Sequence, residues 1–120
     1  MQKEIGLMIA AILVFGFAGF SPMRTIIVEE PATAGKEFGT HVNLRNDLSL
    51  DVEKVNIRIL IYDLGLTFYS SSFDMDKKDG AGLWVFGDMP PYVPAGDYLA
   101  RITASNDDFK EVKHVYIAVG

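Results

Sequence analysis

The chain has 120 residues, of which 49% are hydrophobic and 22% charged, which is the make-up of one globular domain with a single core. Its formal net charge of −5, without any cluster of Lys and Arg, excludes a nucleic-acid backbone as the partner. The sequence has no cysteine, which excludes disulfides, thiolate metal sites, cysteine-linked lipids and a cysteine nucleophile.

The N-terminal residues 1–23 are predicted to be a signal peptide or a membrane anchor. An unbroken apolar run extends from Ile5 to Phe20 after a basic start. As a helix this run would cover about 24 Å, less than the roughly 30 Å of a bilayer core, and small residues near its end favour cleavage after Ala18. An uncleaved anchor is the alternative, and a buried core helix is a third interpretation. In the first two cases residues 24–120 form the extracytoplasmic domain.

From Thr25 onward the pattern has period two and is interrupted by Gly, Pro, Asn and Asp, which is typical of short antiparallel strands. In the third strand Val55, Ile57 and Ile59 occupy alternate positions, which predicts a face turned to the core. We therefore expect an all-β fold, a seven-stranded antiparallel β-sandwich preceded by one N-terminal apolar helix. The predicted strands are Thr25–Glu29, Glu37–Arg45, Lys54–Asp63, Thr67–Phe73, Leu83–Phe86, Asp97–Ser105 and Val112–Val119.

Three stretches of this pattern carry a family resemblance. They are Pro31-Ala-Thr-Ala-Gly35, Val42-Asn-Leu-Arg-Asn46, and Pro94-Ala-Gly-Asp-Tyr98 followed by Arg101-Ile-Thr-Ala-Ser-Asn106. The chain from Thr25 to Val119 resembles the immunoglobulin-like modules of archaeal and bacterial cell-surface proteins, including the adhesion-related type of S-layer-associated chains. The resemblance implies an immunoglobulin-like sandwich and a location at the cell surface, and it transfers no binding residue.

The most specific element of the resemblance is Pro94-x-Gly96-x-Tyr98, which matches the tyrosine corner of such sandwiches. Tyr98 is therefore predicted to bond back to the backbone and fix the crossover. Trp84, the only tryptophan, is the second residue assigned a structural role, although it falls in the fifth predicted strand and not in the third, as it would in an antibody domain.

Acidic residues gather in the loops after the second, fourth and sixth predicted strands, which up-and-down connections bring to one end of a sandwich. The segment from Asp74 to Gly80 has the composition of a calcium loop without its spacing, because Lys78 stands at the fifth ligand position. A solvated hairpin turn is the preferred interpretation. The calcium ligands of the alternative interpretation are Asp74, Asp76, Asp79, Asp107 and Asp108.

The opposite end is predicted to carry the contact with a partner. The stretch Met89-Pro90-Pro91-Tyr92-Val93-Pro94 is stiff and partly apolar, so little conformational entropy would be lost when it binds. The alternative, which we prefer on general grounds, is that these residues close the open end of the sandwich.

No catalytic motif is predicted: the sequence has neither a strained nucleophile turn nor a phosphate loop, and a sandwich of this size offers no deep cleft. His41 and His114 point outward from different sheets in the predicted register, so they do not share a metal. The resulting hypothesis is a non-catalytic module, secreted or anchored in the membrane through its N-terminus, that binds a protein or an envelope glycan. The alternative is a self-assembling envelope or filament subunit in which an edge strand, with Val112–Val119 as the candidate, pairs with a neighbouring copy.

Overall fold

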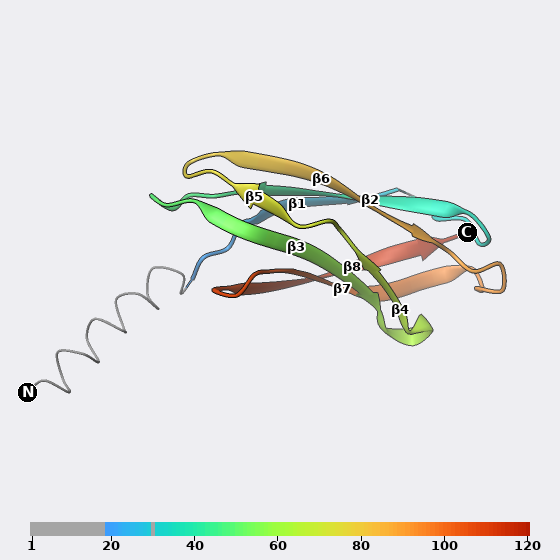
Figure 1. Cartoon of the computed structure of the whole chain (residues 1–120). Coiled ribbons are helices and arrows are strands. Elements are labelled where there is room, and N and C mark those ends of the chain that lie inside the picture. Colours follow the sequence, from blue (N-terminus) through green and yellow to red (C-terminus); the bar gives the residue numbers. More distant parts are fainter. Residues whose placement is uncertain (1–18, 30) are drawn as a thin grey trace, which may run out of the picture.

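The computed structural model describes residues 19–29 and 31–120. In these residues the chain forms eight β-strands and one short 3-10 turn, η1, arranged in two layers (Figure 1). The predicted N-terminal helix and the cleavage after Ala18 lie outside the described residues. The elements are β1 (Met23–Val28), β2 (Glu37–Arg45), β3 (Val52–Ile61), η1 (Tyr62–Leu64), β4 (Leu66–Tyr69), β5 (Phe73–Met75), β6 (Gly80–Asp88), β7 (Gly96–Ser105) and β8 (Lys110–Val119).

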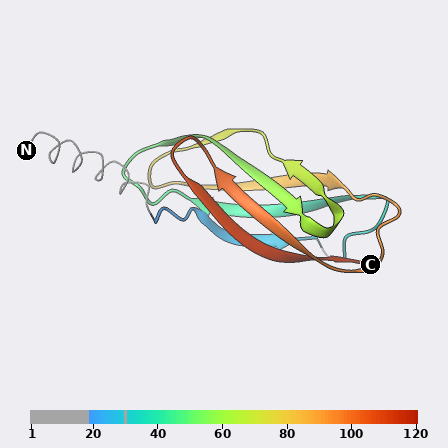
Figure 2. The same cartoon turned by 90° about the horizontal axis from the view of Figure 1, so that it is seen from below.

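The two layers are antiparallel sheets of unequal width. The three-stranded sheet has the order β1-β2-β6, and the five-stranded sheet has the order β4-β3-β7-β8, with β5 also paired to β3. Figure 2 shows the five-stranded sheet in front of the other. The expected all-β antiparallel sandwich is thus confirmed, and consecutive strands change sheet between β2 and β3, between β5 and β6, and between β6 and β7.

The core lies between the sheets and is built from alternate residues of each strand. The face of β3 predicted to point inward is fully buried, at 0–1% exposure from Val55 through Ile61. Phe38 of β2 lies opposite, and its ring meets the ring of Phe68 edge-on with centroids 5.3 Å apart. Phe68 in turn fills the space beside Gly87, where an added Cβ would lie 2.3 Å from its ring. Each fully buried side chain of this kind stabilises the fold by about 1.5–3 kcal/mol.

The strand count differs from the predicted seven because the region expected as one strand, Thr67–Phe73, is divided into β4 and β5. Both pieces pair with β3, but Lys54 has a positive φ of 55° and the register shifts between Val52 and Val55. At the break the hydroxyl of Ser70 accepts a hydrogen bond from the Ile57 N–H at 2.8 Å. A side chain thus replaces one backbone acceptor there, and the ladder of backbone hydrogen bonds along β3 is interrupted.

The loops gather at two ends, as expected from up-and-down connections. Loops 46–51, 76–79 and 106–109 lie at the end where the described chain begins, and the C-terminus lies at the other end (Figure 1). Asn46 of the first loop holds this end together, because its buried side-chain amide donates to three backbone carbonyls. These acceptors belong to Leu50, Met75 and Asp76, so one asparagine ties two loops to each other.

Candidate functional site

The loop expected to contact a partner is divided between core and surface. Met89 and Val93 are buried, Pro90 is half-buried, and Pro91, Tyr92 and Pro94 are exposed. The loop is also bonded to its neighbour, since the Gly35 N–H donates to the Met89 carbonyl at 2.8 Å. Because they are buried, the side chains of Met89 and Val93 are not accessible to a partner. They close this end of the sandwich, which would otherwise leave the core open to water. Tyr92 is the largest side chain that this loop leaves at the surface.

The predicted tyrosine corner is present. The Tyr98 hydroxyl donates to the Pro94 carbonyl at 2.7 Å, four residues upstream. Gly96, between them, has a φ of 155° and lies at the start of β7, where the chain enters the five-stranded sheet. The hydrogen bond expected of Tyr98 is thus present, in the connection from β6 to β7.

The calcium candidates share one end of the molecule without converging. Among residues 19–29 and 31–120 no three His, Cys, Asp or Glu side chains lie close enough together to hold a metal ion. Asp74 accepts a hydrogen bond from the Lys54 N–H at 2.9 Å, and Asp79 accepts one from the Gly80 N–H at 2.8 Å, so both carboxylates are already bonded to the backbone. Asp76, Asp107 and Asp108 are exposed. The arrangement corresponds to the solvated-turn interpretation of this segment.

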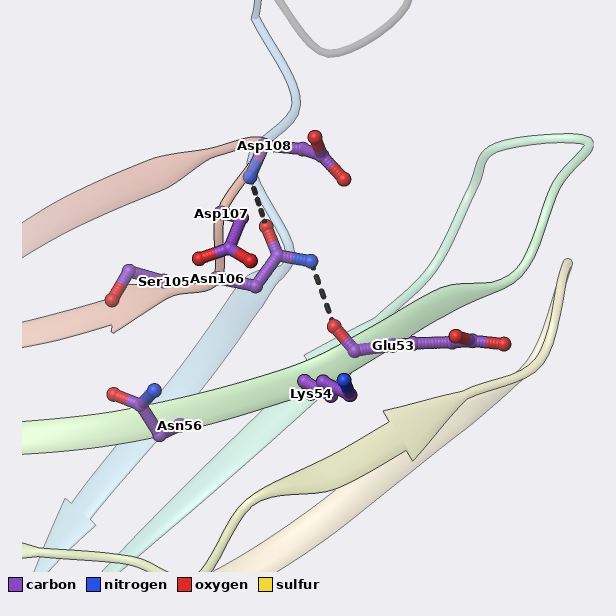
Figure 3. A pocket seen from close by; sticks show the side chains of 7 residues that line it. All are labelled: Glu53, Lys54, Asn56, Ser105, Asn106, Asp107 and Asp108. Atoms are coloured by element: carbon purple, nitrogen blue, oxygen red, sulfur yellow. Dashed lines mark hydrogen bonds between the residues drawn. The ribbon is translucent and has the colours of Figure 1, made fainter.

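Beside these acids lies an open hollow of about 470 Å³ between β3 and the β7–β8 loop (Figure 3). Asn106 organises it: its amide donates to the Glu53 carbonyl at 2.9 Å, and its Oδ1 accepts from the Asp108 N–H at 2.8 Å. The hollow is polar and wide open, so it offers neither an apolar wall nor an enclosed space for a small ligand. Its lining residues are Glu53, Lys54, Asn56, Ser105, Asn106, Asp107 and Asp108.

The outer face of the three-stranded sheet carries a feature that the sequence analysis missed. Trp84 and Phe86 of β6 and Ile27 of β1 point away from the core and are 48%, 52% and 54% exposed. His41 of β2 lies between β1 and β6, because it pairs with Ile27 on one side and with Trp84 on the other. We call these four residues the aromatic platform. Trp84, which was assigned a structural role from the sequence, thus lies half exposed at the surface.

The two large rings of the platform lie low over the sheet. The Trp84 and Phe86 rings are nearly parallel, at an interplanar angle of 15° and with centroids 5.9 Å apart. They share the space above Gly39 of β2, where an added Cβ would lie 3.0 Å from both rings. Gly39 is buried by this arrangement, although it faces outward. The missing side chain at position 39 allows both rings to lie over the neighbouring strand.

Comparison with known proteins supports the fold and goes no further. No family model matches the sequence, and no curated protein matches it. Among solved structures, the CARDB domain of a Pyrococcus furiosus protein, determined with two metal ions bound, matches with a TM-score of 0.58 and 15% identity. The match covers 84% of this chain and 91% of that domain.

Two longer proteins contain a similar sandwich. The sporulation control protein Spo0M of Bacillus subtilis matches with a TM-score of 0.56 and 13% identity, over 83% of this chain and 50% of the other. A family 123 glycoside hydrolase of Clostridium perfringens matches with a TM-score of 0.51 and 14% identity, over 73% of this chain but only 21% of the hydrolase. At these identities the likeness establishes an immunoglobulin-like β-sandwich, and function has to be argued from the surface of this chain.

Proposed function

We propose that this chain is a non-catalytic, extracytoplasmic module of the cell envelope, and that it binds an envelope glycan on the aromatic platform. The observation that carries the proposal is the pair of nearly parallel, half-exposed rings of Trp84 and Phe86 on an otherwise open sheet face. Nearly parallel aromatic rings that lie low over a sheet offer a flat apolar surface of about the size of a sugar ring, and the C–H groups of a sugar can pack on their π-faces.

The surroundings of the platform favour a glycan over a protein. Three half-exposed apolar side chains offer roughly 300 Å² of contact, well below the ~800 Å² per partner of a stable protein interface. Glu29 lies beside Gly39, to whose N–H it is hydrogen-bonded at 3.0 Å, and Glu37 and Asp88 pair with each other farther along the face. Carboxylates accept hydrogen bonds from sugar hydroxyls and repel acidic sugars, so a neutral glycan is the expected ligand.

The proposed location rests on the N-terminal sequence. The apolar run Ile5–Phe20 would direct residues 24–120 out of the cytoplasm, either secreted or tethered. In residues 19–29 and 31–120 no helix is long and apolar enough to span a bilayer. The intact mass of the protein from membrane, medium and cytoplasmic fractions tests the location: loss of about 18 residues in the medium indicates a secreted module, and full length in the membrane indicates a tethered one. Recovery only from the cytoplasm would contradict both.

Self-assembly through an edge strand is the competing proposal, and β8 is bonded to other segments through its backbone at its end and through side chains at its start. At the end of β8, the Ala32 N–H donates to the Ala118 carbonyl at 2.8 Å, and the Gly120 N–H donates to the Ala32 carbonyl at 3.0 Å. At its start, Glu111 accepts from the Met23 N–H at 2.7 Å, and Lys113 donates to the Met23 carbonyl at 2.9 Å. A strand from another copy would have to displace these contacts, which disfavours β8 as an addition site.

Trp84 is the only tryptophan of the chain, so its fluorescence reports directly on the platform. We expect neutral oligosaccharides of four or more sugar units to shift the emission of the full-length chain, kept in a nonionic detergent, to shorter wavelength. Removing Phe86 (Phe86→Ala) keeps the reporter and should weaken binding at least tenfold, since stacking aromatics are typical hot spots. Trp84→Ala should abolish retardation in gels containing the same glycan.

Tyr69→Ala is the matched control, because Tyr69 is an exposed aromatic on the other sheet and should not affect glycan binding. If no neutral glycan changes the emission, or if Phe86→Ala behaves like Tyr69→Ala, the glycan proposal is wrong. An emission shift that instead follows protein concentration, together with dimers in sedimentation, would identify a second copy as the occupant of the platform.

A further inference from the structure

The outer face of the five-stranded sheet contains a second hollow, of about 340 Å³, with a different chemistry. Its lining includes the cations Arg58 of β3 and Lys110 of β8 and no carboxylate. In a chain with a net charge of −5, a hollow with two cations and no acid is a local reversal of charge. The remaining lining residues are neutral polar side chains and one tyrosine, namely Asn56, Tyr69, Thr103, Ser105 and Asn106.

The strand register explains why the two cations face a common space. Arg58 pairs with Thr103, and Ser105 pairs with Lys110, so Thr103 and Ser105 of β7 lie between the strands that carry the charges. Arg58 and Lys110 are separated by two strand spacings across the sheet and by two residues along the strands. Their Cα atoms are therefore about 12 Å apart. Both side chains are long enough to meet above β7, where either can contact the same bound group.

Thr103 shows that the floor of this hollow has an unmet hydrogen-bonding capacity. The residue is 3% exposed, and its Oγ1 has no hydrogen-bond partner. Arg101, two residues away on the same face, also has a buried Nε without a partner. A buried polar atom without a partner costs free energy, so a group bound at the floor of the hollow that bonded to the Thr103 hydroxyl would relieve that cost.

We propose that this hollow, called here the cationic hollow, binds an oxyanion group, which is a carboxylate, a sulfate or a phosphate borne by a larger ligand. Arg58 supplies a planar fork of donors that matches two oxygens of such a group, and Lys110 supplies a point charge from the opposite side. Ser105 and Asn56 provide neutral donors between them, and Thr103 forms the floor.

The neighbouring carboxylates determine in which direction the rest of the bound ligand can extend. The hollow of Figure 3 shares Asn56, Ser105 and Asn106 with the cationic hollow and adds one cation, Lys54, and three carboxylates, those of Glu53, Asp107 and Asp108. These carboxylates repel a negatively charged ligand on that side. The rest of the ligand therefore extends away from the β7–β8 loop and over Tyr69, whose ring is exposed. The site lies on the opposite sheet from the aromatic platform and is independent of the glycan proposal.

The test is a titration of the full-length ¹⁵N-labelled chain with inorganic phosphate, inorganic sulfate and acetate, each at constant ionic strength set with chloride. We expect saturable shifts of the Thr103 and Ser105 amides and of the Arg58 Nε–H with at least one of the three anions. Arg58→Gln and Lys110→Gln should each weaken this binding about tenfold, as expected for the loss of a charged hydrogen-bonding partner. The anion that binds most tightly identifies the oxyanion class of the ligand.

Lys36→Gln is the matched control, since it changes the net charge by the same unit in the loop at the far end of the molecule. It should leave the anion titration unchanged. Linear, non-saturating shifts with all three anions would overturn the proposal, and so would equal binding by Arg58→Gln and Lys36→Gln. Thermal unfolding of each variant distinguishes a loss of binding from a loss of folding. If Arg58→Gln does not fold, Lys110→Gln tests the site in its place. Because the titration does not use Trp84 or any glycan, its outcome is separate from the test of the platform.

Discussion

The two outer faces of the sandwich differ far more than the two inner faces. The outer face of the three-stranded sheet carries the aromatic platform, with carboxylates beside it. The outer face of the five-stranded sheet carries Arg58, Arg101 and Lys110 among neutral polar groups and tyrosines. Both inner faces present the same kind of apolar surface, because they pack on each other.

The difference indicates which positions of this fold are free to carry functional side chains. Packing at near-crystalline density constrains every inward position, whereas an outward position in the middle of a sheet needs only to tolerate solvent. Large aromatic rings on one outward face and paired cations on the other are therefore not requirements of the fold. The comparison predicts that the platform contributes to binding and the core to stability, and three pairs of substitutions test this division.

The largest effect is expected from the two phenylalanines on opposite faces of the same sheet. Phe38 of β2 is buried, and Phe38→Ala should lower the free energy of unfolding by about 3–5 kcal/mol through the cavity it leaves. Phe86 of β6 is half exposed, and Phe86→Ala should cost about 1 kcal/mol or less. Chemical denaturation measures both values. Equal losses would mean that the platform is a part of the core.

A smaller effect is expected when the rings are displaced without being removed. In Gly39→Val the new side chain would meet both rings of the platform, so Trp84 and Phe86 must move and stability should fall by about 1–3 kcal/mol. Glycan binding should fall with it, because the flat surface is lost. Asn43→Val, on the same strand and face, is the control and should leave Trp84 emission unchanged. Intact binding by Gly39→Val would show that the ring geometry is not what recognises the ligand.

The smallest effect is expected at Tyr98, which belongs to neither outer face. Tyr98→Phe removes the hydroxyl that donates to the Pro94 carbonyl and should cost about 1 kcal/mol in thermal or chemical unfolding. Tyr116→Phe, at an exposed tyrosine of β8, should cost less. Neither substitution should change binding at the platform or the cationic hollow. A binding defect in Tyr98→Phe would show that the β6–β7 crossover positions one of the two faces.

The sequence by itself determined the class of fold, the face of β3 that is buried, the tyrosine corner and the grouping of loops at two ends. It succeeded where one face of a strand is apolar and the other is not, as along Val55 to Ile61, and where a short motif such as Pro94 to Tyr98 requires one local geometry. Such information is local, so the periodicity and the turn residues already contain it.

Only the tertiary structure decided the rest. In β6 both faces are apolar, because Leu83 and Val85 alternate with Trp84 and Phe86, so the period alone does not say which set points inward. The sequence left open whether Met89 and Val93 contact a partner or close the end of the sandwich, and the structure buries both in the core. The cationic hollow arises from Arg58 and Lys110, which are 52 residues apart in sequence and meet only through the register of three strands. Alternation specifies that a strand has two faces, but the pairing of the sheets determines which face is buried and which side chains become neighbours.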